Sequence, residues 1–264
     1  MFSRPLNDYE LQFWKDNHYL VLRQPFTPEQ REELQRWTNE MTSWPEAPGK
    51  WMKYFEPSPL TGEKMLCRIE NFLPYHDGFS NLLQNDILFE ILEQLMGEPA
   101  VLFKEKINLK LAGGAGFGAH QDAPAFITFD QRYHITMMLA IDDSTIDNGC
   151  LQFSSPVDTY KTLAQNPDGT ICSELEKELP WTSLEVQAGD VVLFDSYIPH
   201  RSPTNPSKKS RRAGFITYNR ESEGCHRDDY FADKRRSFPP ECERVEGMDY
   251  SEKESLYNLG NPIR

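Results

Sequence analysis

Residues 189–200 read Gly-Asp-Val-Val-Leu-Phe-Asp-Ser-Tyr-Ile-Pro-His, a turn followed by an apolar strand with a histidine at its open end. Strand-like patterns continue on both sides, at residues 101–111, 133–141, 184–186 and 214–218, with Gly, Asp, Asn and Pro turns between them. Helical patterns come earlier in the chain. Helices first and many short strands afterwards favour a helix-backed β-sandwich or barrel over an alternating βαβ sheet.

The first hundred residues carry the helical signals. Residues 7–17 predict a short helix, and residues 18–22 predict a strand. Thr27, Pro28 and Gln30 form a capping box with proline at the first helical position, which predicts a helix that runs to about residue 41.

A further helix is predicted where apolar residues repeat with helical spacing before the stop signals Gly97 and Pro99: Leu88, Ile91, Leu92, Leu95 and Met96. Residues 44–62 hold four prolines and two glycines, so we expect a long loop there.

The charge balance excludes several functions. The 264 residues carry 28 Lys and Arg against 41 Asp and Glu, a net charge of −13. Because no basic tract could neutralise phosphates, we expect no nucleic-acid partner. No apolar run approaches the roughly 20 residues of a membrane-crossing helix, and no signal peptide is evident. Five widely spaced cysteines favour reduced thiols in a cytoplasmic protein. No obligate protein partner is evident.

Two of the six histidines are placed to bind a metal. His120 and Asp122 are two residues apart, and on an extended chain such residues point to the same face. A third ligand could come from a later strand beside this one, and His200 is the best candidate. Two imidazoles and one carboxylate form the facial triad of non-haem Fe(II) oxygenases. A His-x-Asp pair by itself is common by chance.

A basic residue at a specific spacing adds weight to the metal hypothesis. Arg211 follows His200 by eleven residues, at the start of the strand 211–219. If this strand runs antiparallel to the His200 strand, the Arg211 guanidinium can hold the far carboxylate of a dicarboxylate that chelates the iron.

With these residues the chain resembles the phytanoyl-CoA dioxygenase family of Fe(II)/2-oxoglutarate oxygenases. The resemblance covers residues 18–219 and rests on four marks: His120-Gln121-Asp122, Ile141-Asp142-Asp143 followed by Asn148-Gly149-Cys150-Leu151, Ala188-Gly189-Asp190, and His200-x-Ser202 with Arg211. It implies a mainly β fold with flanking α-helices, the double-stranded β-helix or cupin-like jelly roll. It also implies one domain over residues 1–264, with a helical N-terminal part and lid (1–100), a jelly-roll core (101–219) and a C-terminal wrap (220–264).

The resemblance implies roles for particular residues. His120, Asp122 and His200 would bind Fe(II), and Arg211 and Ser202 would bind the C5 carboxylate of 2-oxoglutarate. Arg212 is the rival of Arg211, and the spacing favours Arg211. Asn108 and Lys106 resemble positions that help to bind the co-substrate. Thr136 or His134, on a strand that lines the pocket in this fold, could also contact it.

The activity implied is hydroxylation of a C–H bond with 2-oxoglutarate and O2, releasing succinate and CO2, and ascorbate can stimulate such enzymes. The chain departs from many members at Ser154-Ser155-Pro156, where they have Pro-Gly-Ser-His, so we expect a reshaped loop near the mouth of the pocket. The carboxylate of Asp122 leaves no open position for a halide, which disfavours a halogenase.

The substrate is expected to be a small polar or zwitterionic metabolite of the aminophosphonate, amino-acid or betaine type. The acidic surface disfavours the phosphates of coenzyme A. Trp51 and Tyr54 could form an aromatic wall for an ammonium, and Arg68 and Asn71 could bind a carboxylate or phosphonate. These segments resemble the branch that hydroxylates aminoethylphosphonates. Core packing or a surface ion pair would explain each residue equally well.

Three alternatives remain from the sequence. The same iron site could desaturate a substrate or close a ring. A cupin-type metalloenzyme that does not use 2-oxoglutarate is also open, although such a site has no use for the carboxylate clamp of Arg211. A catalytically silent binding module is disfavoured because all three ligand types are retained.

Overall fold

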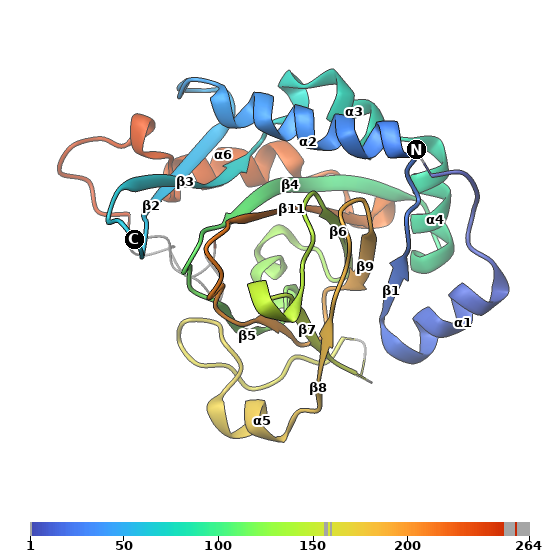
Figure 1. Cartoon of the computed structure of the whole chain (residues 1–264). Coiled ribbons are helices and arrows are strands. Elements are labelled where there is room, and N and C mark those ends of the chain that lie inside the picture. Colours follow the sequence, from blue (N-terminus) through green and yellow to red (C-terminus); the bar gives the residue numbers. More distant parts are fainter. Residues whose placement is uncertain (1, 156–157, 159, 251–256, 258–264) are drawn as a thin grey trace.

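A computed structural model describes residues 2–155, 158, 160–250 and 257. It contains two facing β-sheets whose paired strands are antiparallel, with helices on the outside of the larger sheet (Figure 1). The larger sheet has the order β1-β9-β6-β11-β4-β3-β2, and the smaller sheet has the order β5-β10-β7-β8. The strands are β1 (Tyr19–Leu22), β2 (Met52–Pro57), β3 (Lys64–Glu70), β4 (Ala100–Lys110), β5 (Phe117–His120), β6 (His134–Ala140), β7 (Leu151–Ser154), β8 (Trp181–Leu184), β9 (Val191–Asp195), β10 (His200–Ser202) and β11 (Arg211–Arg220). The expected jelly roll is confirmed.

The helices of the N-terminal half follow the sequence signals. The α-helices are α1 (Asp8–Asn17), α2 (Pro28–Ser43), α3 (Asp77–Leu83), α4 (Asp86–Met96), α5 (Ser173–Glu178) and α6 (Arg227–Ser237). At the start of α2 the Thr27 hydroxyl accepts from the Gln30 amide, and the Gln30 side chain accepts from the Thr27 amide, as the capping box predicts. Helix α4 ends at Gly97 in the left-handed conformation.

The expectation of a long loop at residues 44–62 is wrong. Strand β2 forms inside this segment and pairs with β3, with Met52 opposite Glu70 and Tyr54 opposite Arg68. The prolines lie at or outside the ends of β2, so they do not remove hydrogen bonds from the middle of the ladder. Together with β1, these strands show that the first hundred residues contribute to the larger sheet as well as providing helices.

Both faces of the larger sheet are buried, which explains the apolar run in β6. Ile135, Met137 and Leu139 join the cluster that packs beneath the helices, whereas Met138 and Ala140 join the cluster between the two sheets. Strands covered on both sides read as continuous apolar runs rather than as alternating ones. Helix α4 contributes five buried side chains to the outer cluster, so we expect Ile91→Ala to cost about 2–5 kcal/mol of folding free energy.

Candidate active site

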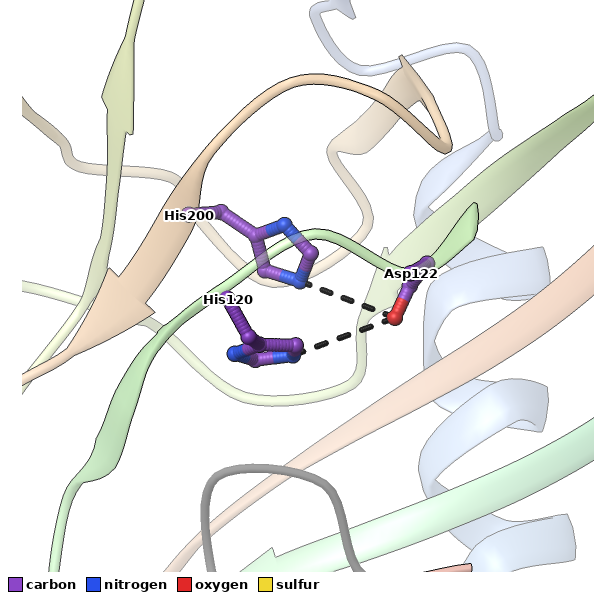
Figure 2. Close-up of side chains that lie close together, drawn as sticks. All are labelled: His120, Asp122 and His200. Atoms are coloured by element: carbon purple, nitrogen blue, oxygen red, sulfur yellow. Dashed lines mark ion pairs between the residues drawn. The ribbon is translucent and has the colours of Figure 1, made fainter. Parts of the chain in front are cut away.

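Two histidines meet in the smaller sheet. Strands β5 and β10 are paired so that His120 lies opposite His200. The Nε2 atoms of these residues lie 3.8 and 3.9 Å from Oδ1 of Asp122 (Figure 2). One donor atom from each of the three residues lies within 4.8 Å of the others, which is compact enough for one metal ion to bridge them.

The three side chains converge for a different reason from the one expected. Strand β5 ends at His120, and Asp122 has helical backbone angles of −74° and −31°, so the two-residue period of a strand does not aim the carboxylate. The chain instead turns into a short 3-10 helix at Ala123, whose amide donates to the Ser196 carbonyl oxygen at 2.9 Å. This turn brings Asp122 back toward the histidines. The Thr136 hydroxyl lies 3.4 Å from its Oδ2, leaving Oδ1 directed at both rings.

The protonation of the triad suits a divalent cation. Nδ1 of His120 lies 2.7 Å from the Gly118 carbonyl oxygen, and Nδ1 of His200 lies 3.1 Å from the Ile198 carbonyl oxygen. Because a carbonyl can only accept, Nδ1 carries the proton and each Nε2 offers its lone pair. Burial and the neighbouring His200 lower the pKa of His120. Burial opposes ionisation of Asp122, but His200 and His120 overcome it and lower the pKa of its carboxyl group. The donor set therefore fits Fe(II).

A cavity extends from the triad between the two sheets. Of the residues singled out from the sequence, Arg211, Ser202, Asn108, Lys106 and Thr136 line it along with the triad. His134 instead places Nε2 2.9 Å from Oε1 of Gln131. Among the described residues that line the cavity, none comes from residues 1–100, the part that was expected to provide a lid.

Arg211 lies at one end of this cavity beside Lys110, its direct partner across β4 and β11. Nε of Arg211 donates to the Asn148 carbonyl oxygen at 3.1 Å, and its Nη2 donates to the Gly149 carbonyl oxygen. Nζ of Lys110 donates to the same Gly149 oxygen at 3.1 Å and to the Ser202 hydroxyl at 2.9 Å. Two cations and a hydroxyl thus form a site that matches a carboxylate.

The expected pairing of the Arg211 strand is wrong. Strand β10, which carries His200, pairs with β5 and β7, whereas β11 pairs with β4 and β6 in the other sheet. The chain crosses between the sheets after Ser202, and the buried amide of Asn205 donates to the carbonyl oxygens of Leu111 and Lys209 at 3.0 and 2.8 Å. Arg211 therefore faces the triad from the opposite wall. Its neighbour Arg212 pairs with Asp142, 2.7 Å away, and does not line the cavity formed by the described residues.

The four residues predicted to bind substrate are placed differently from one another. Tyr54 is buried, and its hydroxyl donates to the Phe238 carbonyl oxygen at 2.8 Å. The indole of Trp51 donates to the Pro45 carbonyl oxygen at 2.8 Å. Asn71 receives a hydrogen bond from Arg227 at 3.3 Å. Arg68 alone lies next to the cavity, since its Nε lies 3.2 Å from Oδ1 of Asn108. Substrate contacts by these residues stay predictions.

Two lysines that line the cavity were not singled out from the sequence. Lys104 and Lys110 share a face of β4 with Lys106 and Asn108, as the two-residue period requires. The alternation in residues 101–111 was the available signal. Asp122 is the only acidic side chain among the described lining residues, so basic side chains predominate in the cavity of a chain with a net charge of −13.

The fold and the triad define the class, a non-haem Fe(II)/2-oxoglutarate-dependent dioxygenase. The solved structure of EctD from S. alaskensis with 2-oxoglutarate and 5-hydroxyectoine has this architecture, with a TM-score of 0.72 and 19% identity over 84% of this chain and 79% of that chain. The model of the phytanoyl-CoA dioxygenase family matches residues 14–213. The chain belongs to the phytanoyl-CoA dioxygenase family.

Two curated relatives are similar over most of their length. The 2-aminoethylphosphonate dioxygenase of uncultured bacterium HF130_AEPn_1 is 56% identical over 251 residues, covering 95% of this chain and 96% of that protein. The methylphosphonate hydroxylase of Gimesia maris is 40% identical over 233 residues, covering 88% of each chain. The family and these relatives make the chain an oxygenase that hydroxylates a small molecule and uses iron and 2-oxoglutarate.

Two further observations concern the chain as a whole. None of the described helices is long and apolar enough to cross a membrane. All five cysteines are free thiols, as their spacing predicted.

Proposed function

We propose that this enzyme hydroxylates 2-aminoethylphosphonate. The observation that carries the proposal is the 56% identity to a 2-aminoethylphosphonate dioxygenase over nearly the whole of both chains. The basic lining of the cavity supports an anionic substrate, because Lys104 and Lys106 line it in addition to the two basic residues at the Arg211 end. The acidic surface remains unfavourable for a carrier as highly charged as coenzyme A.

The carbon attacked follows from a comparison of the two relatives. Methylphosphonate has a single carbon, which is bonded to phosphorus, and 2-aminoethylphosphonate has one such carbon and one that carries the amine. If this enzyme and both relatives hold the phosphonate in the same way, the shared target is the carbon bonded to phosphorus. In the proposed reaction this C–H becomes C–OH, while 2-oxoglutarate and O2 become succinate and CO2.

In the proposed mechanism, His120, Asp122 and His200 hold the iron, which when bound supplies activation of O2 coupled to oxidative decarboxylation of 2-oxoglutarate. The carbonyl oxygens of Gly118 and Ile198 fix the two rings. The hydroxyl of Thr136 holds the Asp122 carboxylate in place. Such outer contacts orient the ligands and determine which nitrogen carries the proton.

The co-substrate is bound at the far wall. Arg211, Lys110 and Ser202 receive its C5 carboxylate, and its keto-acid end then points toward the triad. Asn108 and Thr136 line the space between and are proposed to help seat it. Leu151, Phe194 and Phe215 provide apolar walls that limit water around the reacting groups.

The proposal is tested by anaerobic reconstitution with Fe(II), addition of 2-oxoglutarate and measurement of the visible charge-transfer band of the chelate. Exposure to O2 with 2-aminoethylphosphonate should then yield equal amounts of succinate and a hydroxylated phosphonate, detected by phosphorus NMR. His120→Ala should abolish the band. His226→Ala, which changes a partly exposed histidine outside the cavity lining, is the matched control and should keep it. A band that survives His120→Ala contradicts the metal assignment, and succinate without phosphonate product contradicts the substrate.

A further inference from the structure

Lys104 has an ammonium group with no acceptor among the described residues. Its Nζ lies over the faces of Phe126 and Tyr230, at 4.4 and 5.2 Å from the ring centroids. No hydrogen bond or ion pair joins Nζ of Lys104 or of Lys106 to a described side chain or carbonyl, and the Lys106 Nζ lies 5.8 Å from the centre of the Phe215 ring. Both lysines line the cavity.

Lys104 and Lys106 are partly buried, whereas the fully buried lysines of the described chain all have acceptors. Lys234 pairs with Glu70 at 2.6 Å, and Lys53 donates to the Thr42 carbonyl oxygen at 2.9 Å. Lys110 has the acceptors described above at the Arg211 end. Lys104 and Lys106 face the cavity with aromatic rings but no described acceptor beside their ammonium groups, and aromatic faces offset only part of the cost of partly desolvating a cation. Lys104 and Lys106 are therefore candidates to bind an anion that enters the cavity.

The position of Lys104 separates it from the proposed co-substrate site. In the larger sheet Lys104 lies opposite Thr217, which lies opposite Thr136, and the Thr136 hydroxyl contacts Asp122. Lys110 lies opposite Arg211, six residues further along β4. The row that contains Lys104 is thus beside the metal ligands, and the row that contains Arg211 is at the other end of the cavity.

The cavity has basic side chains that 2-oxoglutarate would leave without an anionic partner. The two cations at the Arg211 end face the single C5 carboxylate of 2-oxoglutarate, and its other carboxylate would chelate iron. Neither group balances Lys104 or Lys106. Burial lowers the pKa of both ammonium groups, and an anion bound beside them would favour their charged form. A phosphonate carries more negative charge near neutral pH than a carboxylate and offers three acceptor oxygens, much as a phosphate group does.

We propose that Lys104, with Lys106 beside it, binds the phosphonate group of the substrate and makes the enzyme select phosphonates over carboxylates of the same length. The inference rests on the proposed function, because it assigns the headgroup of that substrate. Phe126 and Tyr230 hold the Lys104 side chain from two sides, so its ammonium is directed before the substrate arrives. The two lysines are binding residues and take no part in bond breaking.

The test compares Lys104→Met and Lys104→Arg with the wild type and with Lys208→Met, an exposed lysine outside the cavity lining. Two or three charge-assisted hydrogen bonds are lost in Lys104→Met, so the KM for 2-aminoethylphosphonate should rise by about 30-fold or more. The Kd for 2-oxoglutarate, read from the chelate band, should change by less than about threefold. This limit is used because the effects of changes at distant sites are independent to within ~0.5 kcal/mol. Lys104→Arg should recover part of the loss, and Lys208→Met should match the wild type.

Selectivity and binding provide separate readouts. Wild type should release succinate far faster with 2-aminoethylphosphonate than with β-alanine, its carboxylate analogue, and Lys104→Met should lose that preference. A wild-type KM in Lys104→Met overturns the inference while leaving the proposed function intact, as does an equal loss of 2-oxoglutarate affinity. If the wild type does not turn over 2-aminoethylphosphonate, the proposed function fails. Anaerobic binding of methylphosphonate to the Fe(II)/2-oxoglutarate enzyme then tests the inference. Weaker binding to Lys104→Met than to the wild type supports it. Equal binding to the two proteins, or no binding to the wild type, overturns it.

Discussion

Lys110 and Arg211 lie directly opposite each other on strands β4 and β11, and both donate to the carbonyl oxygen of Gly149. Two cations share one acceptor at the end of the cavity remote from the triad. Arg211 retains donors that can reach an anion, whereas the ammonium of Lys110 donates to the Gly149 and Pro203 carbonyl oxygens and to the Ser202 hydroxyl. If this group binds the C5 carboxylate as proposed, the affinity for 2-oxoglutarate should depend on each of its members.

Arg211→Ala should weaken 2-oxoglutarate binding by about ten- to a hundredfold, since hydrogen bonds between charged groups contribute about 1.5–3 kcal/mol. Iron binding should change little, because Arg211 does not contact the triad residues of the described structure. Titration of the chelate band with 2-oxoglutarate, and of the apoenzyme with Fe(II), measures the two affinities. Arg212→Ala is the matched control. It breaks the pair with Asp142 at a cost of about 1 kcal/mol in stability and should leave both affinities unchanged. If Arg212→Ala weakened 2-oxoglutarate binding and Arg211→Ala did not, Arg212 would be the residue that binds the C5 carboxylate.

The affinity for 2-oxoglutarate should fall as the pH rises above neutrality. Burial and the nearby Arg211 lower the pKa of the Lys110 ammonium to about 7 in the empty site. Below this pH the lysine is protonated and attracts the dianion, whereas above it binding must first recover a proton, so the Kd should rise by up to tenfold per pH unit. Lys110→Met should bind weakly at pH 6.5 and show no such slope. Parallel pH profiles for the two proteins would contradict this role of Lys110.

Gly149→Ala should damage both stability and co-substrate binding. The residue has a φ of +74°, and a Cβ there would lie 2.5 Å from the carbonyl oxygens of Pro203 and Thr204. The control is Gly62→Ala, which has a φ of +73° but no atom within 4 Å of the added Cβ. Both variants should lose about 1–2 kcal/mol from the left-handed backbone. Only Gly149→Ala should lose more and also weaken 2-oxoglutarate, as urea denaturation and the chelate band would show. Equal losses in the two variants would mean that the close approach has no energetic effect.

His18 should make stability depend on pH. Its Nδ1 lies 2.6 Å from Oδ2 of buried Asp195, whose Oδ1 accepts from the Tyr197 amide in the segment before His200. The hydrogen bond to Asp195 raises the pKa of His18 above its usual 6.5. The resulting stability is fully present below about pH 6.5 and is lost as the pH rises through the raised folded-state pKa.

The measurement compares urea denaturation of the wild type and His18→Asn between pH 5.5 and 8.5. Asparagine is chosen because it tolerates the left-handed backbone of His18, which has a φ of 62°. The stability advantage of the wild type should shrink with increasing pH. An advantage that grows with pH would show that the neutral imidazole makes the stronger contact.

Much of the fold could be predicted because its signals are local. The capping box at Thr27 and the apolar stripe of α4 each depend on a few neighbouring residues, and the structure has both helices where expected. Strand β2 was missed because prolines around it suggested a loop, and its pairing with β3 depends on contacts far apart in the sequence. The pairing partner of β11 was wrong for the same reason, since spacing along the chain does not reveal which sheet a strand joins.

The candidate site was predicted in part. The structure brings His120, Asp122 and His200 together, although a turn rather than an extended strand aims Asp122. Lys104 and Lys110 were overlooked because lysines on an alternating strand usually face solvent, and only the tertiary fold turns that face inward. Tyr54 illustrates the opposite case, since an aromatic residue suited to a pocket wall also suits the core, where its hydroxyl contacts the Phe238 backbone.

Strand β4 carries two different surfaces on alternate residues. Lys104, Lys106, Asn108 and Lys110 face the cavity, while Glu105 and Ile107 face the other side and are buried. Inserting or deleting one residue within this stretch would exchange the surfaces, sending an acidic and an apolar side chain toward the iron site. New substrate preferences can therefore arise in this strand through the exchange of single side chains, but not through a change in its length. We expect insertions and deletions to be tolerated only in the loops beyond its ends.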